Sequence, residues 1–396
     1  INRPGLADIY ELVLHPDDPY RYRYDGEWRE LERGKARMKV RLWGNLVVPV
    51  TREMLWSVHG PVVRQGDKAY ALRFVGFGEV NVLEQWRLMN KAQNLDDFLA
   101  AMNRLTMLSF NTLYADREGN LFYAYGAKFP KRSTEFDWTK MLPGDTSKAV
   151  WTEFHPFPAI PQVLNPPSAF IQSCNSGPFH TTVGEGNPGP EDFCPSMRIE
   201  THLTNRSRRA LALYGADEAI TREEFYTYKY DKGYDPESAT AKWVRKVLTM
   251  KPPEDSNIAA ALEILKGWDH SGDRNSTGTA LVMLAREMDH AEDADEMECL
   301  CDAAHYLLEK YGRLDVPWEE MLRLRRGVLD LGLGGCPDCL RAIDIKLQDD
   351  GRFTGINGDC FFQMVEWGAD GTLRSESIHQ YGSAAADKDS PHYADQ

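Results

Sequence analysis

The sequence has no run of apolar residues long enough to span a lipid bilayer, and it has no block of basic residues. It carries 46 Lys and Arg against 60 Asp and Glu, which gives a formal net charge of −14 at pH 7. Phosphate backbones and anionic lipid headgroups repel a chain of this charge. Nucleic acid and membranes are therefore not expected as partners. The first residues, Ile1–Gly5, also lack the apolar segment of a signal peptide.

Cysteine is scarce, with seven residues, an odd number. Two close pairs, Cys299-x-Cys301 and Cys336-x-x-Cys339, together contain as many thiols as a four-thiolate zinc site requires. However, the first pair lies in a stretch with helical spacing, and a second CxxC knuckle is missing. We therefore expect free buried thiols or a disulfide at these positions, and no metal.

The sequence also lacks a G-x-S-x-G elbow, so no serine is nominated for a Ser–His–Asp triad, although there are ten histidines. It contains no internal repeat and no low-complexity tract. Its composition is that of a globular protein, with 42% apolar and 11% aromatic residues. Its 396 residues are enough for one large domain or two average ones.

The first half of the chain shows strand patterns followed by helix patterns. Asp25-Gly26, between two strand-like runs, predicts a β-hairpin, and Asn94 opens a predicted helix. A second hairpin is expected from Phe110–Ala115 and Leu121–Tyr125. Further strands are expected at residues 8–14, 20–24, 28–31, 39–42, 46–50 and 70–74, and a helix at 81–90.

From Ile199 onward helical patterns dominate, and Thr221-x-x-Glu224 is a capping box. Strand patterns return after Leu340. The expected helices cover residues 199–214, 239–249, 258–266, 279–287, 296–311 and 319–329. These patterns predict helices layered on sheets, in three parts: a first part over 1–198, a helical insertion over 199–330 and a return to the core sheets over 331–396.

A chemically distinctive stretch covers Asn165–Phe179. Pro166 and Pro167 mark a turn, and the apolar Ala169–Ile171 after them predicts a short buried strand. Asn175 follows at the end of that strand, where its side-chain NH₂ can stabilise a developing oxyanion in acyl transfer. The alternative is that Asn175 only supplies a left-handed or Asx-turn conformation.

This stretch is one of several motifs that occur in a recognisable order. The others are Val58–Val63 (VHGPVV), Asn111–Asn120 (NTLYADREGN), Gly334–Ala342 (GGCPDCLRA) and Ser390–Gln396 (SPHYADQ). Together they resemble the β-chain of the penicillin acylase family of N-terminal-nucleophile hydrolases, in the branch of the acyl-homoserine-lactone and aculeacin-type acylases. The resemblance covers nearly the whole chain. It implies an α+β fold, a four-layer αββα sandwich with an inserted helical region, without the N-terminal strand that bears the nucleophile.

The resemblance also implies a set of catalytic residues. Val62 would donate its backbone N–H to the oxyanion and Asn175 its side-chain N–H, while Arg198 would support Asn175. His59 would be a motif residue and not the base. Two further residues are candidates for lining the acyl pocket: Thr112 and Phe110.

In the resembled family the nucleophile is a serine that autoproteolysis exposes as the first residue of the β-chain. Its own α-amino group, with a pKa near ~8, serves as the base. Residue 1 of this sequence is Ile, and no internal Gly-Ser-Asn cleavage site is present. We therefore expect an interior segment that is inactive by itself.

The expected function is that of a segment of an amidohydrolase that cleaves linear N-acyl amides and supplies the oxyanion hole. Its expected partners are an N-acyl amide substrate and the α-chain of the same precursor, in the periplasm or outside the cell. No cofactor is expected, and no carboxylates are assigned to the calcium ion that relatives often carry. Two alternatives stay open: an acylase of penicillins or cephalosporins, and a non-catalytic homologue that binds acyl compounds or a partner protein.

Overall fold

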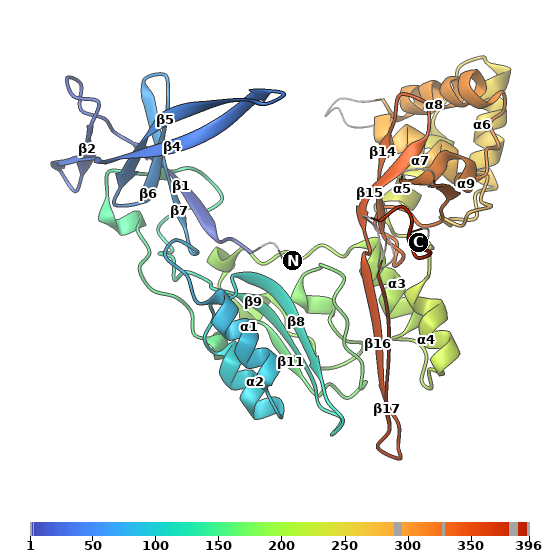
Figure 1. The fold of residues 1–396 in the computed structure, drawn as a ribbon, viewed down its shortest axis with the longest axis horizontal. Coiled ribbons are helices and arrows are strands. Elements are labelled where there is room, and N and C mark those ends of the chain that lie inside the picture. The colour runs from blue at the N-terminus through green and yellow to red at the C-terminus, as the bar shows by residue number, and fades with distance from the viewer. Residues whose placement is uncertain (1, 3, 289–294, 327–328, 380–386, 394–396) are drawn as a thin grey trace. The chain divides into compact units, whose positions relative to one another are not determined.

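The structure is a computed structural model that describes residues 2, 4–288, 295–326, 329–379 and 387–393 (Figure 1). The chain divides into two compact units, Ile1–His202 and Leu203–Gln396. We call these the first unit and the second unit and describe each by itself.

A six-stranded sheet forms one part of the first unit. Its neighbouring strands run antiparallel, except that the short strand β10 pairs with β1 in parallel. In sheet order the strands are β10 (Leu142–Pro143), β1 (Ala7–Leu12), β7 (Lys68–Phe74), β6 (Gly60–Gln65), β5 (Leu46–Ser57) and β4 (Glu32–Trp43).

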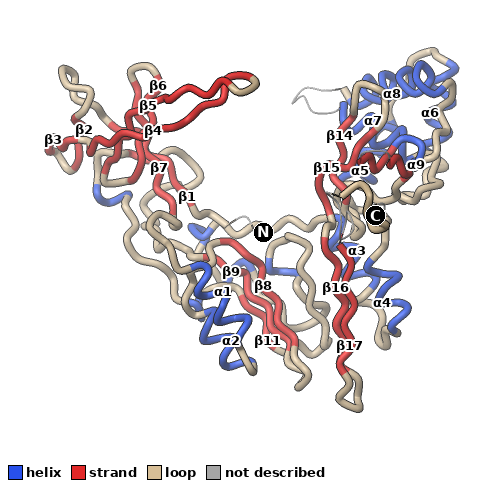
Figure 2. Tube along the Cα trace, viewed as in Figure 1, coloured by secondary structure: helices blue, strands red, loops and turns tan. Residues whose placement is uncertain are grey.

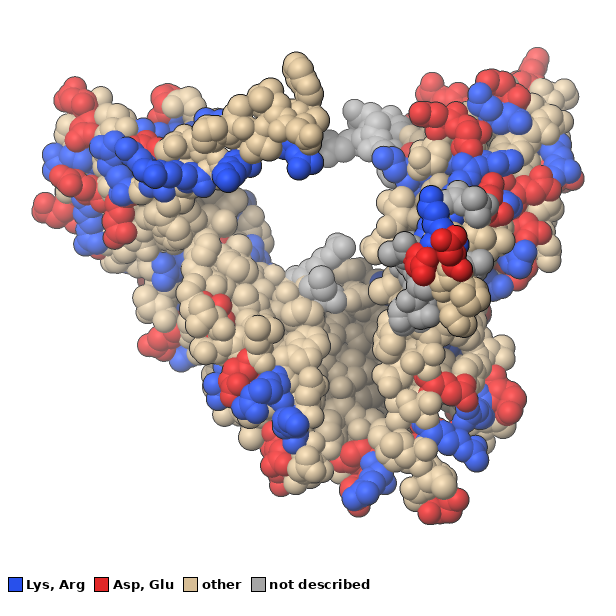
Figure 3. Space-filling view, viewed as in Figure 1, with Lys and Arg blue, Asp and Glu red and all other residues tan. Residues whose placement is uncertain are grey.

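Strand β4 carries a row of basic side chains. Every second residue of a strand faces the same side, and the exposed residues at alternate positions here are Arg33, Lys35, Arg37, Lys39 and Arg41. Figure 3 shows this row along the strand. Because β4 is the edge strand of the sheet, the charges disfavour pairing of that edge with a further strand.

The hairpin predicted at Asp25-Gly26 is confirmed. Strands β2 (Arg21–Tyr24) and β3 (Glu27–Glu30) pair antiparallel. The two turn residues have φ values of 49° and 85°, and a type I′ turn requires a positive φ at both positions.

A three-stranded sheet forms the other part of the first unit, with two helices against one of its faces (Figure 2). The contact includes the rings of Phe98 and Tyr114, whose centroids are 4.7 Å apart. The predicted hairpin and the first helix are confirmed, and the Asn94 side chain caps the second helix by accepting a hydrogen bond from Asp97 N. The elements are β11 (Gln162–Leu164), β9 (Leu121–Ala127), β8 (Ser109–Ala115), α1 (Val82–Lys91) and α2 (Leu95–Met102).

Aromatic side chains fill the core of the first unit. Four of these residues are at most 1% exposed, and each buries a large apolar area: Tyr10, Tyr123, Tyr125 and Phe129. The Tyr10 hydroxyl donates to the Ala149 carbonyl oxygen at 2.8 Å, so its polar end is satisfied inside the core.

The second unit is built around α7 (Thr279–Met288). Its residues from Thr279 to Ala285 are all buried, as expected for a helix surrounded by others. Trp318 and Phe353 extend the same core, with no exposed surface. The other helices are α3 (Asn205–Leu213), α4 (Arg222–Lys229), α5 (Ala239–Thr249), α6 (Ser256–Lys266), α8 (Glu296–Tyr311) and α9 (Trp318–Met321).

Two small sheets complete the second unit. One has four strands and the other is a two-stranded hairpin. The capping box predicted at the start of α4 is confirmed, because Thr221 and Glu224 each accept from the other's backbone N–H. The strands are β13 (Leu329–Gly332), β12 (Leu322–Arg326), β15 (Phe353–Gly358) and β14 (Ile343–Leu347) in sheet order, then β16 (Phe361–Trp367) with β17 (Leu373–His379). Among the described residues, no helix is both long and apolar enough to cross a membrane.

The predicted helix at 319–329 is wrong. Only its start is helical, in α9, and β12 follows directly. The alternation of Leu322 and Leu324 with Arg323 and Arg325 has a period of two, which favours a strand. The strands after residue 331 pair with β12 and with one another, so the second unit holds both the predicted insertion and the predicted return. The three-part division expected from the sequence stays a prediction.

Candidate active site

The stretch around Asn175 forms a loop of turns after β11. The predicted strand at Ala169–Ile171 is wrong: β11 ends at Leu164, before the prolines, and Ala169 adopts a positive φ of 51°. Pro166 and Pro167 favour extended or turn geometry for the residues before them. The apolar run Ala169–Ile171 is too short to form a strand that hydrogen-bonds to a neighbouring strand. Asn175 therefore lies on a loop and not at the end of a strand.

Asn175 is exposed and has a φ of 59°, in the left-handed region that Asn tolerates better than most residues. The turn role that the sequence left open is thus present in the backbone. The next residues fix the loop, because a Cβ added at Gly177 would collide with the Glu200 carbonyl oxygen and only glycine avoids that contact. The side chain of Asn175 therefore extends from a constrained backbone, and its donation to an oxyanion stays a prediction.

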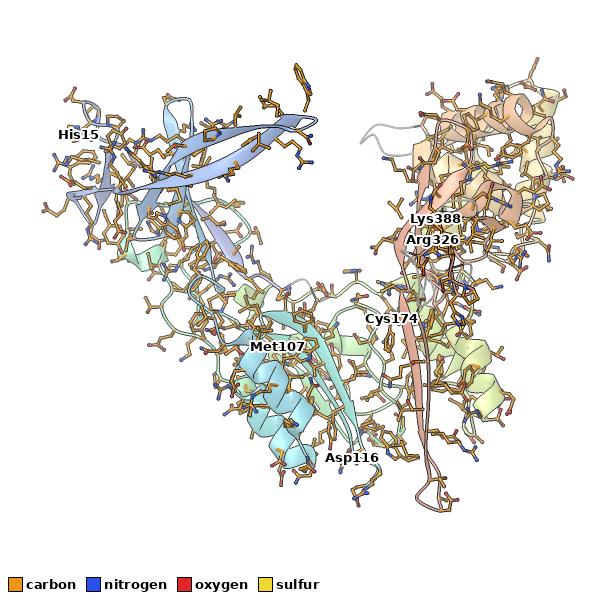
Figure 4. The ribbon with its side chains drawn as sticks, viewed as in Figure 1. His15, Met107, Asp116, Cys174, Arg326 and Lys388 are labelled. Carbon is orange, nitrogen blue, oxygen red and sulfur yellow. The ribbon has the colours of Figure 1, made fainter. Side chains whose placement is uncertain are left out.

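The loop is anchored to the three-stranded sheet next to Asn175. Asn111 Nδ2 donates to the Ser176 carbonyl oxygen at 3.4 Å, and the Tyr123 hydroxyl donates to Asn111 Oδ1 at 3.1 Å. Figure 4 shows Cys174, which precedes Asn175, on the side of β8 away from α1 and α2. No role was expected for Asn111 or Tyr123 from the sequence, although Asn111 opens the motif Asn111–Asn120.

Thr112 and Phe110 lie on the other face of β8. Alternate residues of a strand face opposite sides, and Phe110 contacts Trp86 of α1, with ring centroids 6.2 Å apart. Thr112 is buried and its hydroxyl donates to the Phe110 carbonyl oxygen at 3.4 Å. The structure therefore does not bring them to the face on which Asn111 binds the loop, and their place in an acyl pocket stays a prediction.

Arg198 binds the start of β1. Its Nη1 donates to the Trp138 carbonyl oxygen at 2.7 Å, and its Nη2 donates to the Ala7 carbonyl oxygen at 2.9 Å and to Asp8 Oδ1 at 3.3 Å. These contacts use the planar fork of the guanidinium to hold the start of β1, which lies between β10 and β7 in the six-stranded sheet. Support of the Asn175 side chain by Arg198 stays a prediction.

Asp8 is the centre of a buried ionic network. Its side chain is 1% exposed, and Oδ2 accepts from Arg132 Nε at 3.0 Å and from Trp151 Nε1 at 2.7 Å. Burial lowers the pKa of Arg132, and the nearby Asp8 carboxylate opposes that shift. A buried guanidinium is tolerated only when a carboxylate and further acceptors satisfy its N–H groups. Asp8, Arg132 and Arg198 therefore form one network that depends on the Asp8 carboxylate.

Val62 lies in the middle of β6, opposite Leu55 of β5 and Ala71 of β7. In antiparallel sheets, directly opposed residues alternate between hydrogen-bonded and non-bonded pairs. A strand with a partner on each side therefore directs the N–H of each residue to one of the two. This register indicates that the Val62 N–H is engaged within the sheet, and its donation to an oxyanion stays a prediction.

His59, at the turn into β6, is buried and has 1% exposure. Its Nε2 lies 2.9 Å from the Gly144 carbonyl oxygen, and its ring stacks on Tyr10 with centroids 4.1 Å apart. A carbonyl only accepts, so Nε2 carries the proton. Burial lowers the pKa of His59 to about 4, an effect that the hydrogen bond to Gly144 partly offsets. These contacts describe a neutral structural histidine.

We expect the first unit to lose stability as the pH falls from 6.5 towards 4. The unfolded chain protonates His59 near its usual pKa of 6.5, whereas the folded chain does so only near 4. The unfolded state thus binds more protons in this window, so stability rises with pH by up to about 3 kcal/mol. Urea titrations at several pH values measure this slope. A His59→Phe variant should flatten it, while His202→Gln, at an exposed histidine, should leave it unchanged; equal slopes in all three proteins would contradict the assignment.

The cysteines do not gather into a metal site in the described part of the chain. Cys299 and Cys301 lie on α8, and Cys336 and Cys339 lie between β13 and β14. Among the residues that the structure describes, no group of three or more His, Cys, Asp or Glu side chains is placed to hold a metal ion. None of the seven cysteines forms a disulfide in the structure.

Comparisons with known proteins agree with the resemblance read from the motifs. A family model described as penicillin amidase matches residues 4–396. The acyl-homoserine lactone acylase PvdQ of Pseudomonas fluorescens (strain Pf0-1) is 33% identical over 135 residues, which cover 32% of this chain and 17% of that protein. Penicillin G acylase of Escherichia coli is 30% identical over 178 residues, which cover 43% of this chain and 20% of that protein.

A solved structure supports the predicted fold. A thermostable penicillin G acylase from Alcaligenes faecalis superposes with a TM-score of 0.62 at 18% identity, over 99% of this chain and 80% of that one. The α+β N-terminal-nucleophile hydrolase fold predicted from the motifs is thereby confirmed. The matched regions span less than two fifths of the length of these and further curated relatives, from 16% to 39%.

Proposed function

This chain belongs to the penicillin amidase family, and from that premise we propose that the protein is an acylase, an amidohydrolase that cleaves linear N-acyl amides. The observation that carries the proposal is the match of the family model along residues 4–396. The relatives named as acyl-homoserine lactone acylases and penicillin G acylase support the same reaction class. In the proposed reaction an amide carbonyl is attacked, the amine leaves, and water releases the acyl group.

The proposed role of this chain is to stabilise the oxyanion. A serine nucleophile freed by autoproteolysis would attack the carbonyl and form an acyl-enzyme, and this serine is not assigned among the residues of this chain. Asn175 would donate its side-chain N–H to the negative oxygen of the tetrahedral intermediate. Its exposed position on a loop held through Ser176 and Asn111 supports this role. Val62 is kept as the proposed second donor, and its place in the sheet makes it the weaker of the two.

The proposed setting of the protein also follows from the family. Its α-chain would come from the same precursor, and maturation would take place in the periplasm or outside the cell. A β-lactam acylase is the second candidate, because the Escherichia coli relative at 30% identity is a penicillin G acylase.

Amine release from two substrate classes tests the proposed function. The complete protein is incubated with N-acyl-homoserine lactones of several chain lengths and, separately, with penicillin G, and the freed primary amine is quantified with a fluorogenic reagent. We expect turnover of the homoserine lactones with the larger kcat/KM. A larger kcat/KM for penicillin G would favour the β-lactam acylase. Absence of amine release by protein that has matured into two chains would indicate a non-catalytic homologue.

A further inference from the structure

The segment between β13 and β14 contains a tight turn with a cysteine at each end. Its four residues are Cys336, Pro337, Asp338 and Cys339, and Cys339 N donates to the Cys336 carbonyl oxygen at 3.4 Å. Proline at the second position and the positive φ of Asp338 at the third, 58°, are the features of a type II turn. The two end Cα atoms of such a turn lie within about 7 Å of each other, and a disulfide joins Cα atoms about 4.4–6.8 Å apart.

The two sulfur atoms lie next to the same pair of hydrogen-bonded backbone groups, those of Lys232 and Gly272. Cys339 Sγ donates to the Lys232 carbonyl oxygen at 3.2 Å, and that oxygen also accepts from Gly272 N at 2.8 Å. A Cβ added at Gly272 would lie 2.7 Å from Cys336 Sγ. Both cysteines have 0% exposure. The side chains therefore converge in one buried place and do not point apart.

We propose that Cys336 and Cys339 are a cross-linking site, a dithiol that closes to an intrachain disulfide. In this step the two thiols lose two protons and two electrons and form one S–S bond. The oxidant is a disulfide compound, which takes up the two electrons and two protons and becomes two thiols. The structure holds the pair in its reduced form.

The burial of the pair determines when the bond can form. Burial raises the pKa of the Cys336 thiol well above its usual range, and the neighbouring Cys339 adds to the shift. Only the thiolate attacks a disulfide, so the buried thiols of the folded chain react slowly, and burial also keeps external thiolates away from a bond already formed. The bond therefore forms during folding, and once formed it is protected from reductants.

The cross-link would fix a junction of the second unit. Asp338 accepts from Asn205 N at 2.8 Å, at the start of α3, and Tyr234 donates its hydroxyl to the Pro337 carbonyl oxygen at 2.7 Å. A disulfide stabilises by restricting the unfolded chain, and a four-residue loop gives a modest gain. For a unit of this size we expect the midpoint of thermal unfolding to rise by about 5 °C.

Refolding with a redox buffer and mass spectrometry test the proposal. The denatured and reduced protein is refolded with reduced glutathione alone or with glutathione disulfide, quenched in acid, alkylated in denaturant and digested with trypsin. Residues 327–341 form one tryptic peptide that holds both cysteines and no other. After oxidative folding we expect this peptide to carry no alkyl group and to be two hydrogens lighter than its reduced form. Two alkyl groups on it, or a bond from it to another peptide, would overturn the proposal.

Thermal unfolding with matched variants gives a second readout. The redox-dependent rise of about 5 °C should vanish in Cys339→Ser and persist in Cys360→Ser, whose thiol is exposed. A rise that survives in Cys339→Ser would contradict the assignment to this pair. Should Cys339→Ser fail to fold, the peptide mass of the unchanged protein still decides the question.

Discussion

An Asp8→Asn variant is expected to lose about 3–5 kcal/mol of the stability of the first unit, because it removes the charge that neutralises a buried guanidinium. The Arg132 side chain is 0% exposed, so water cannot replace the lost carboxylate. The amide that Asn introduces also places an N–H where Trp151 Nε1 or an arginine donates. Whichever oxygen the amide nitrogen replaces, the donors bound to that oxygen lose their acceptor, which adds to the loss.

Urea unfolding followed by hydrogen exchange measures this effect for each unit separately. The urea concentration at the midpoint of unfolding should fall for peptides of the first unit, while the slope of the unfolding free energy against urea concentration stays unchanged. Peptides of the second unit should keep their midpoint. Glu153→Gln is the matched control, because Glu153 pairs with Lys131 at 2.9 Å but is 72% exposed. Exposed pairs contribute little, and we expect a change within about 0.5 kcal/mol. Similar losses of unfolding free energy in both variants would show that burial does not determine how much the network contributes to stability.

In the complete, mature protein, Asn175→Ala is expected to lower kcat by roughly 10²–10³, or about 2.7–4 kcal/mol, the usual effect of removing one oxyanion donor. An unchanged KM would accompany it, since the interaction forms in the transition state. Two further variants separate the two roles that the sequence left open for this residue.

Asn175→Gly keeps the positive φ of 59° without strain, but it has no side-chain N–H. If Asn175 acts as a donor, the Gly variant loses as much kcat as the Ala variant; if it only forms the turn, the Gly variant keeps its activity. Val62→Ala retains the backbone N–H and should change kcat little in either case. Activity of Asn175→Ala equal to that of the unchanged protein would remove Asn175 from the proposed mechanism.

Local features of this fold could be predicted from the sequence. The hairpin at Asp25-Gly26 and the capping box of Thr221 with Glu224 depend on residues only a few positions apart. Both can therefore be recognised in a short stretch of the sequence. The error at Leu322–Arg326 arose because this strand pattern is only five residues long and directly follows a helical start, so it was read as the end of that helix.

The buried network could not be predicted in this way. Asp8 is 124 residues from Arg132 and 143 from Trp151, and no periodic pattern connects them. The same holds for the loop of Asn175: its αL backbone is compatible with the sequence, but the bond from Asn111 to Ser176 spans 65 residues. The family motifs predicted roles for Asn175, Arg198 and Val62. They did not indicate that Arg198 binds Asp8 or that Val62 lies between two paired strands.

The contacts of Asp8 and Arg198 have a topological consequence. Gly5 N donates to the Met197 carbonyl oxygen at 3.1 Å, and Arg198 reaches Ala7 and Asp8, so the beginning and the end of the first unit are bonded to each other. The described chain from residue 5 to residue 198 is therefore a closed loop whose ends are tied by polar bonds. Fraying at one end has to break the bonds that hold the other, so the two ends behave as one cooperative segment although they are nearly 200 residues apart.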